Sequence, residues 1–177
     1  AAGWSRTLRE KLRVAGALRD LKVGVIEAGF AAASPGDFEA VSAIAAEIEG
    51  PTICSLARCH PNDIEKAAQA VSSARKQRVH VFVATSEIHR KYKLEMAKDE
   101  IIKRAADAVR MAREVCDDVE FSPEDASRTE PAYLAEVVSA VIEAGARTVN
   151  IPDTVGYTVP GEFADLFGYL KANVAGV

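Results

Sequence analysis

Polar and apolar side chains alternate in the stretch VEFSPED, which begins at Val119. In an extended strand Val119 and Phe121 point to one face. Glu120, Ser122 and Glu124 then point to the other face. A carboxylate such as Glu124 can act as a general base, and a serine hydroxyl can hydrogen-bond a substrate. The stretch therefore predicts a strand with chemistry-bearing groups on one side and an apolar surface on the other.

Four other short apolar runs also bring polar residues to one face or to one end. Glu27 comes near the carboxyl end of VGVIEAGF, and Arg58 ends TICSLAR. His80 lies within VHVFVAT, with the opposite parity from the three valines. Asn150 and Thr154 lie in TVNIPDT. Arginine can hold a carboxylate bidentately, so these positions indicate a small-molecule site rather than a purely structural sheet.

The elements that position these residues alternate along the chain. Thr7 and Glu10 have the spacing of a capping box, and the SPGD stretch from Ser34 combines a cap, a first-turn proline and an early carboxylate. The periodicity predicts a first helix after Thr7 and further helices over Phe38–Ile48, Asn62–Ala74, Lys98–Val115, Pro131–Ala144 and Pro160–Asn173. The expected order is one helix followed by five strand–helix pairs.

This alternation predicts a parallel sheet with right-handed crossovers. Parallel strands are normally apolar on both faces because helices cover them, so polarity on one face is informative. A β/α barrel has helices outside and builds its active site from residues near the carboxyl ends of the strands. A dinucleotide-binding sheet would need a glycine-rich turn, and the sequence has no GxGxxG. We therefore predict an α/β fold, a partial (β/α)8 TIM barrel of about five parallel strands with flanking helices.

Length and composition fit one globular domain. The chain has 177 residues, 49% hydrophobic residues and a net charge of −4, with both signs of charge interspersed, which argues against a nucleic-acid partner. No apolar run is long enough to span a membrane, and the first residues lack a secretory pattern, so the cytoplasm is the expected location. Cys54, Cys59 and Cys116 form no CxxC pair and are expected to be reduced packing residues.

Four long blocks carry a family resemblance: VIEAGFAAASPGDFEAV from Val25, VHVFVATSEIHRKYKLEM from Val79, DDVEFSPEDASRTE from Asp117 and EAGARTVNIPDTVGYTVP from Glu143. Together they closely resemble the 2-isopropylmalate synthase family, a group of metal-dependent β/α-barrel enzymes that perform Claisen-type condensations. The match runs over essentially the whole chain. The stretch AGFAAASPGDFEAV looks more like this family than like the related homocitrate or citramalate synthases.

The resemblance implies a leucine-biosynthesis acyltransferase that joins acetyl-CoA to 2-oxoisovalerate. A divalent metal (Zn, Mg or Mn) would hold the 2-oxo acid, and a base would remove a methyl proton from acetyl-CoA. The enolate would attack the ketone, and hydrolysis of the thioester would follow. A metal ion in a lumen poor in water stabilises the developing charge strongly.

The resemblance also implies roles for individual residues. Glu124 is the expected catalytic residue. The expected substrate-binding residues are Glu27, Arg58, His80, Ser122, Asn150 and Thr154. Glu87, His89 and Lys93 lie in the stretch after the VHVFVAT strand, which we interpret as a solvated loop.

Plainer interpretations stay open at four of these positions. Thr154 could merely cap the turn that follows it. Glu124 could pair with Arg128 at the start of a loop. Glu27 could pair with Arg58 from a neighbouring strand. His80 could be a hydrogen-bonded core residue, as a single strand histidine often is.

Two family signatures are not found in the chain. An LRDGEQ motif would supply a metal-binding aspartate, and AAGWSRT at the start of the chain resembles the loop that follows it. An HxHND motif would supply two metal-binding histidines, whereas His60, His80 and His89 include no HxH pair. Leu18–Asp20 reads LRD but lacks the GEQ continuation, so we interpret it as an exposed helix end.

We therefore expect residues 1–177 to be one catalytic-domain segment that corresponds to family strands 2 to 6, an incomplete barrel lacking the first and the last two strands. It would lack the metal ligands and be inactive alone, and its open sheet edges would favour a homo-oligomer. Two other hypotheses stay open. The chain could be a catalytically silent assembly piece, or it could belong to a relative of the homocitrate or citramalate synthase type.

Overall fold

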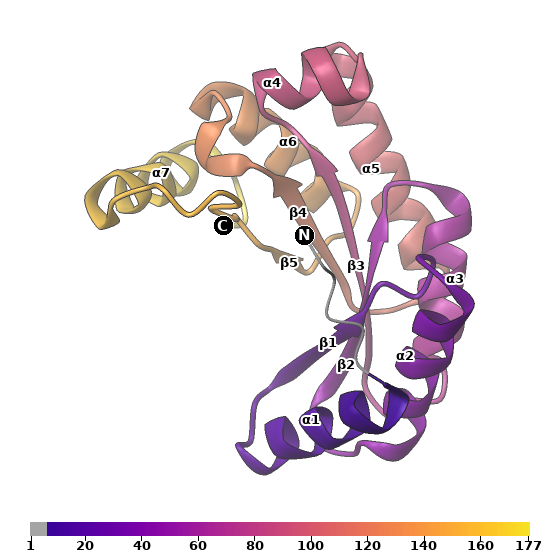
Figure 1. Cartoon of the computed structure of the whole chain (residues 1–177). Helices are drawn as coiled ribbons and strands as arrows, with labels where there is room; N and C mark the ends of the chain where they lie inside the picture. The colour runs from indigo at the N-terminus through magenta and orange to yellow at the C-terminus, as the bar shows by residue number, and fades with distance from the viewer. Residues whose placement is uncertain (1–6) are drawn as a thin grey trace.

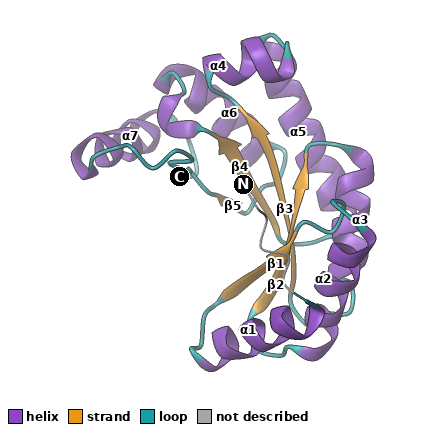
Figure 2. Cartoon of the chain, viewed as in Figure 1, coloured by secondary structure: helices purple, strands orange, loops and turns teal. Residues whose placement is uncertain are grey.

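The computed structural model describes residues 7–177, in which strands and helices alternate along the chain (Figures 1 and 2). The strands form one parallel sheet in the order β1-β2-β3-β4-β5. The strands are β1 (Val25–Gly29), β2 (Thr52–Arg58), β3 (Gln77–Ala84), β4 (Val119–Glu124) and β5 (Thr148–Val149). The helices are α1 (Leu8–Asp20), α2 (Pro35–Glu47), α3 (Pro61–Val71), α4 (Glu87–His89), the π-helical turn η1 (Arg90–Leu94), α5 (Lys98–Val115), the 3-10 turn η2 (Ala126–Arg128), α6 (Pro131–Glu143) and α7 (Pro160–Asn173).

Two predicted helix starts are present with their caps. In α1 the Glu10 backbone N–H donates to Thr7 Oγ1 at 3.3 Å, and the Thr7 backbone N–H donates to Glu10 Oε2 at 2.8 Å. In α2 the Ser34 hydroxyl accepts from the Asp37 backbone N–H at 3.1 Å. The α2 helix begins at Pro35 because proline fits the first helical position. The periodic apolar residues used for the prediction begin only at Phe38.

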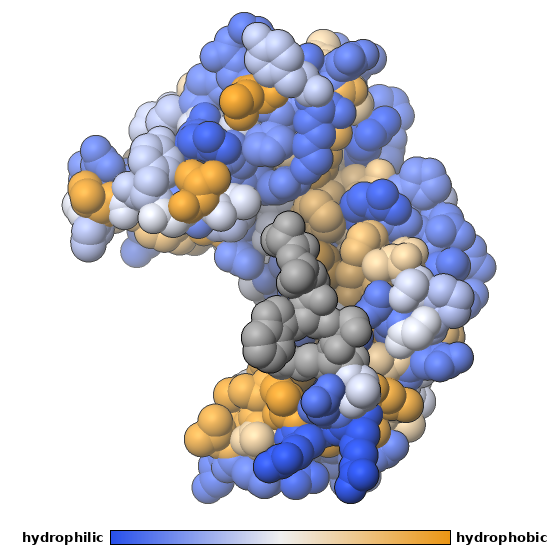
Figure 3. Space-filling model, in the orientation of Figure 1, coloured by the Kyte–Doolittle hydropathy of each residue, from blue (hydrophilic) through white to orange (hydrophobic). Residues whose placement is uncertain are grey.

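The two faces of the sheet differ in chemistry. Val79, Val81 and Val83 of β3 and Phe121 of β4 belong to a buried apolar core shared with α3, α5 and α6. Helices α2, α3 and α5 lie along the convex side of the sheet in Figure 1, and much of their outer surface is hydrophilic in Figure 3. Residues of opposite parity, including His80, therefore lie on the concave side, which we call the inner face. One parallel sheet with helices outside and polar residues inside is the predicted partial barrel.

The last strand is shorter than its sequence suggests. β5 pairs with β4 only through Glu120↔Thr148 and Phe121↔Val149. Pro152 lacks a backbone N–H and cannot extend the ladder as a central strand would. Asn150 and Thr154, expected on this strand, lie in the loop that follows it.

The stretch after β3, expected as a solvated loop, contains α4 and η1. Such short elements give no periodic apolar pattern that a sequence can reveal. Side-chain contacts hold the stretch in place: Arg90 is buried and donates to the Thr85 carbonyl at 2.5 Å and to the two Glu130 carboxylate oxygens at 2.9 and 2.7 Å. Its guanidinium also lies 4.9 Å from the Tyr133 ring centre.

Two smaller expectations concern the beginning of the chain. The LRD sequence ends α1 at Asp20, where Arg19 and Asp20 form an exposed ion pair, as interpreted. Most of the stretch AAGWSRT lies outside the described residues. No helix in residues 7–177 is both long and apolar enough to cross a membrane.

Candidate functional site

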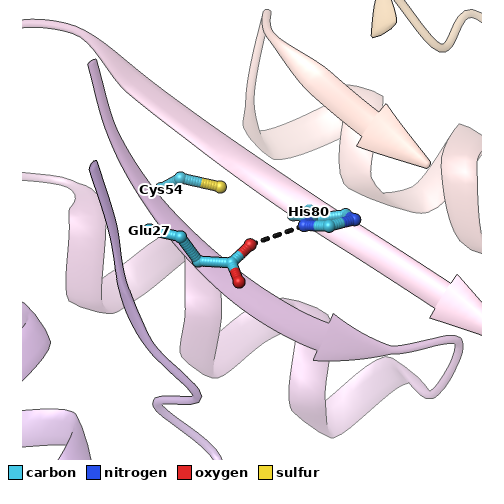
Figure 4. Close-up of side chains that lie close together, drawn as sticks. All are labelled: Glu27, Cys54 and His80. Carbon is cyan, nitrogen blue, oxygen red and sulfur yellow. Dashed lines mark hydrogen bonds and ion pairs between the residues drawn. The ribbon is translucent and has the colours of Figure 1, made fainter. Parts of the chain in front are cut away.

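Three side chains from three strands form a hydrogen-bonded chain on the inner face, which we call the inner-face triad. His80 of β3 stands between Glu27 of β1 and Ser122 of β4. Its Nδ1 lies 2.6 Å from Glu27 Oε2, and its Nε2 lies 2.7 Å from Ser122 Oγ. Figure 4 shows the bonded Glu27 and His80 side chains. The His80 side chain is 8% exposed and that of Glu27 is 45% exposed, so the triad is reachable from the Glu27 side.

The two hydrogen-bond partners of His80 determine which ring nitrogen donates and which accepts. A carboxylate accepts hydrogen bonds and does not donate them, so the Nδ1 proton of His80 is directed at Glu27. In the neutral ring Nε2 is then an acceptor, and the Ser122 hydroxyl donates to it. This order leaves the oxygen lone pairs of Ser122 available to an incoming donor. The alternative pairing of Glu27 with Arg58 is wrong.

A second charged cluster lies deeper on the same face. Arg78, two residues before His80, donates to Asp118 Oδ2 and Glu120 Oε2, both at 2.9 Å. Glu120 Oε1 is also 3.8 Å from His80 Nε2. Burial opposes the charge of Arg78, but the hydrogen bonds to Asp118 and Glu120 outweigh it and the pKa of Arg78 is raised. This cluster therefore places the carboxylates of Asp118 and Glu120 beside the triad, and the Arg78 guanidinium holds both of them in position.

Glu124 lies at the carboxyl end of β4, two positions beyond Ser122 on the same face. Lys93 Nζ donates to both of its carboxylate oxygens at 2.9 Å. His89 Nε2 is 4.0 Å from Glu124 Oε1. The alternative pairing with Arg128 is wrong, because Arg128 donates to Asp125 Oδ1 at 2.7 Å instead.

Asp125 organises the turn after Glu124. Its side chain is fully buried and its backbone is left-handed, with φ of 66°. Its Oδ2 lies 3.1 Å from His89 Nδ1, and its backbone N–H donates to Thr154 Oγ1 at 2.9 Å. Burial opposes the charged form, but hydrogen bonds from Arg128 and Ser86 outweigh it and lower the pKa of Asp125. Thr154 is therefore brought to the end of β4, where it holds this turn.

Two expected binding residues are not joined to the triad. Arg58 is 61% exposed and forms a two-point ion pair with the buried carboxylate of Asp63, at 2.5 and 3.1 Å. Its guanidinium lies 5.3 Å from the Phe30 ring centre. Asn150 is exposed, and its backbone N–H donates to the Phe121 carbonyl at 2.9 Å.

A cavity of about 390 Å³ opens at the carboxyl ends of β2 and β3. Its lining includes Glu124, the apolar ring of Phe82 and the cationic side chains of Arg58, Lys93 and Arg104. The volume is within the range of small-molecule sites. Glu124 belongs both to this cavity and to the row of inner-face residues on β4, so a group bound in either place would lie near its carboxylate.

The comparisons with known proteins agree on one family. The HMGL-like family model matches residues 1–176. The chain belongs to the HMGL-like family. The 2-isopropylmalate synthase of Rhodopirellula baltica is 59% identical over 172 residues, which cover 97% of this chain and 33% of that protein. The 2-isopropylmalate synthase of Methylacidiphilum infernorum is 58% identical over 173 residues, which cover 97% of this chain and 34% of that protein. The resemblance inferred from the sequence is confirmed.

The chain spans about a third of the length of these curated relatives. Among solved structures, the HMG-CoA lyase of Bacillus subtilis has a TM-score of 0.77 at 16% identity, covering 98% of this chain and 60% of that one. The hydroxymethylglutaryl-CoA lyase of Pseudomonas aeruginosa has the same TM-score at 20% identity and the same coverage. At such low identity the likeness concerns the fold, and it supports the partial barrel.

One group of described residues has the composition of a metal site. Single potential ligand atoms of Glu27, Cys54 and His80 lie within 4.8 Å of one another (Figure 4). They do not fit an ion as they stand, because Glu27 and His80 are directly bonded at 2.6 Å and Ser122 occupies the other ring nitrogen. Burial, and next the charge of Glu27, raises the pKa of Cys54, whereas metals bind the thiolate. That the chain holds no metal ligands stays a prediction.

Sequence reasoning missed three contributors to the site. Arg78 has the same strand parity as His80, so the inner-face cluster could have been predicted from alternation. Cys54 of β2 could have been placed on the inner face by the same alternation, because it lies beside Glu27 in the strand register. Lys93 gave no such signal, because its position depends on the π-helical turn.

Proposed function

We propose that this chain forms part of the catalytic barrel of a 2-isopropylmalate synthase, which condenses acetyl-CoA with 2-oxoisovalerate in leucine biosynthesis. The observation that carries the proposal is the position of Glu124. In a chain 59% identical to a 2-isopropylmalate synthase, a carboxylate stands at a strand end beside both a polar inner face and an open cavity. This is where a barrel of this kind places its reacting groups.

Glu124 serves as the general base in this proposal. Its carboxylate takes a proton from the methyl group of the acetyl thioester, and the C–H electron pair becomes the enolate. The enolate carbon then bonds to the ketone carbon of the oxo acid, whose C=O electron pair becomes an alkoxide that takes up a proton. Water cleaves the thioester, giving the carboxylic acid and the free thiol of CoA. A carboxylate within reach of the methyl group is suited to the first step.

The two substrates occupy the two places that meet at Glu124. The 2-oxo acid binds on the inner face, where the Ser122 hydroxyl exchanges its hydrogen bond to His80 for one that it donates to a substrate oxygen. The acyl thioester enters the cavity, where Phe82 offers an apolar surface and Arg58 and Arg104 offer positive charge. A bound divalent metal would polarise the ketone. We assign no step through it to Glu27, Cys54 or His80, because their hydrogen bonds do not fit a ligand set.

Thr154, in the loop after β5, and Asp125, in the turn after β4, support this arrangement. The Thr154 hydroxyl accepts from the Asp125 backbone N–H, which holds the turn directly after Glu124. We further propose that residues 1–177 act as one catalytic-domain segment, in the cytoplasm and within a homo-oligomer. Arg58 and Asn150 keep their proposed substrate-binding roles, Arg58 at the cavity and Asn150 at the β5 end.

Substrate assays on the full-length gene product test the proposal. Thiol release from acetyl-CoA is measured with 2-oxoisovalerate, 2-oxoglutarate or pyruvate, and we expect turnover to be highest with 2-oxoisovalerate. Glu124→Gln keeps the shape but removes the base, and we expect it to lower kcat by about 1,000-fold. Glu136→Gln, on the exposed side of α6, is the control and should keep wild-type turnover.

Other results would revise the function. Preference for 2-oxoglutarate or pyruvate would indicate a homocitrate or citramalate synthase, and no turnover with any oxo acid would favour a catalytically silent assembly piece. Wild-type turnover in Glu124→Gln would remove Glu124 from the chemistry.

A further inference from the structure

The stretch between β3 and α5 brings a lysine to Glu124 by an uncommon route. Lys93 lies in η1, a single π-helical turn of the kind that often occurs at functional sites. The turn ends at Glu95 in a left-handed conformation, with φ of 53°. Its first residue, Arg90, is buried and bonded to Glu130 and to the Thr85 carbonyl. The Arg90 hydrogen bonds therefore hold the turn in place and set the direction of each side chain that the turn presents.

Two lysines of this turn point to different carboxylates. Lys91 Nζ reaches Glu87 at 2.5 Å, and these side chains are 62% and 60% exposed. Lys93 Nζ reaches both oxygens of Glu124 at 2.9 Å, and the Glu124 side chain is only 22% exposed. The first pair is local to the helical turn and lies in solvent. The second joins residues 31 positions apart and lies at the cavity.

The other charged groups near Glu124 have different partners or stand farther away. His89 Nε2 is 4.0 Å from Glu124 Oε1, and the ring is shared with Asp125 through Nδ1. Arg58, which also lines the cavity, is paired with Asp63. The cavity lining also includes Arg104 of α5, His60 and Asp63. Of the cations in residues 7–177 that line the cavity, Lys93 is the one bonded to both Glu124 oxygens.

We propose that Lys93 is a positioning residue for Glu124, which holds the carboxylate in the orientation that proton abstraction requires. The inference rests on the proposed function. A glutamate at a strand end has free rotation about its terminal bond, and a donor shared by both oxygens restricts that rotation. Correct orientation of a base is a large part of its effect. An ammonium group also leaves lone pairs on both oxygens, so the fixed carboxylate still accepts a proton.

The role differs from that of a catalytic residue, because Lys93 acts through Glu124 and not on the substrate. Removing the ammonium should therefore slow proton abstraction while leaving substrate binding nearly unchanged. Arginine at the same position should restore much of the rate, since its guanidinium can bond both oxygens of one carboxylate. A lysine that only stabilised the fold would show neither pattern.

The experiment uses the full-length gene product with Lys93→Met, Lys93→Arg and the matched control Lys91→Met, which alters the solvent-exposed pair of the same turn. Two quantities are measured: kcat and KM for both substrates, and exchange of the acetyl-CoA methyl protons with deuterated water. We expect Lys93→Met to lower kcat and exchange about tenfold with each KM within about twofold. Lys93→Arg should recover at least about a third of the rate, and Lys91→Met should match the wild type.

A double variant separates this inference from the proposed function. If Lys93 acts through Glu124, adding Lys93→Met to Glu124→Gln should cause no further loss. The positioning role would be overturned by wild-type kcat in Lys93→Met. It would also be overturned if Lys93→Met lowered kcat in the Glu124→Gln background by as much as it does in the wild type. Glu124 would remain the base in either case. Full activity in Glu124→Gln would remove Glu124 from the chemistry, and no turnover of the wild type with any oxo acid would overturn the proposed function itself. Thermal unfolding of Lys93→Met within about 2 °C of the wild type would confirm that the fold is intact.

Discussion

The inner-face triad is built differently from the cavity rim, which is the name we give to Lys93, Arg90 and the turn at Asp125. Glu27, His80 and Ser122 stand on three neighbouring strands, whose backbone ladders fix their spacing. Lys93 and the turn at Asp125 stand on short connections, whose positions depend on side-chain contacts. The His80 side chain is 8% exposed and that of Lys93 is 50% exposed.

Because of this difference, substitutions in the two regions should have different consequences. A substitution in the triad removes a chemical group from a place that the sheet keeps unchanged. A substitution in the rim can also change where its neighbours lie, because Arg90 and Asp125 hold the connections in position. Substitution of the residues that hold the rim connections, such as Arg90, should therefore change stability, whereas substitution on the inner face should change activity with little effect on stability.

After the loss expected for Glu124→Gln, the largest effect should come from the triad. His80→Phe keeps a ring of similar size on β3 but removes both hydrogen bonds, and it leaves Ser122 without its acceptor. We expect turnover of the full-length gene product to fall about 100-fold, with little change in the thermal midpoint. Glu136→Gln, on the exposed side of α6 and away from the cavity lining, is again the control. A large drop in stability without loss of turnover would show that His80 is a core residue.

At the rim, the anchor should matter more for stability than for chemistry. Arg90→Met removes the guanidinium hydrogen bonds to the Glu130 carboxylate and to the Thr85 carbonyl, and we expect it to lower the free energy of unfolding by about 2 kcal/mol. Lys98→Met is matched, because Lys98 also contacts Glu130, at 3.1 Å, and the Tyr133 ring, at 4.9 Å, but is half exposed. Its effect should be below about 1 kcal/mol. Equal losses in denaturant titrations would mean that burial of Arg90 is not what anchors the turn.

The smallest expected effect is a loss of folding stability at acid pH. A hydrogen bond from Arg90 is the main cause that lowers the pKa of Glu130 from 4.5 to about 2. A carboxyl with a lowered pKa in the folded state stabilises the protein above its ordinary pKa, and this stabilisation is lost as pH falls from about 4.5 towards 2. Because Glu130 is 43% exposed, we expect only about 1 kcal/mol over that window. Glu130→Gln should flatten this part of the stability profile, and Glu136→Gln should not.

Strand parity explains how much of this site could be predicted from the sequence. Alternation placed His80 and Ser122 on the inner face and the valines of β3 in the core, and the structure agrees. Alternation does not give the register between strands, so the sequence could not choose between Arg58 and His80 as the partner of Glu27. Parity was informative because helices cover only one face.

The rim was largely unpredictable for a physical reason. Lys93 and Glu124 are 31 residues apart, and their contact depends on one π-helical turn, a buried arginine and a left-handed residue. None of these has a periodic sequence pattern. The alternative pairing of Glu124 with Arg128 followed from nearness along the chain, whereas the left-handed turn at Asp125 brings Arg128 to Asp125 instead.

The π-helical turn has one residue more than an α-helical turn would need, and each residue of an α-helix rotates the chain by about 100°. Deleting a single residue there would rotate the ammonium of Lys93 away from the cavity, even if every side chain of the turn were kept. At this place the number of residues, and not only their identity, determines the chemistry at the strand end. Relatives that differ by an insertion or deletion between β3 and α5 should therefore hold their base by other means.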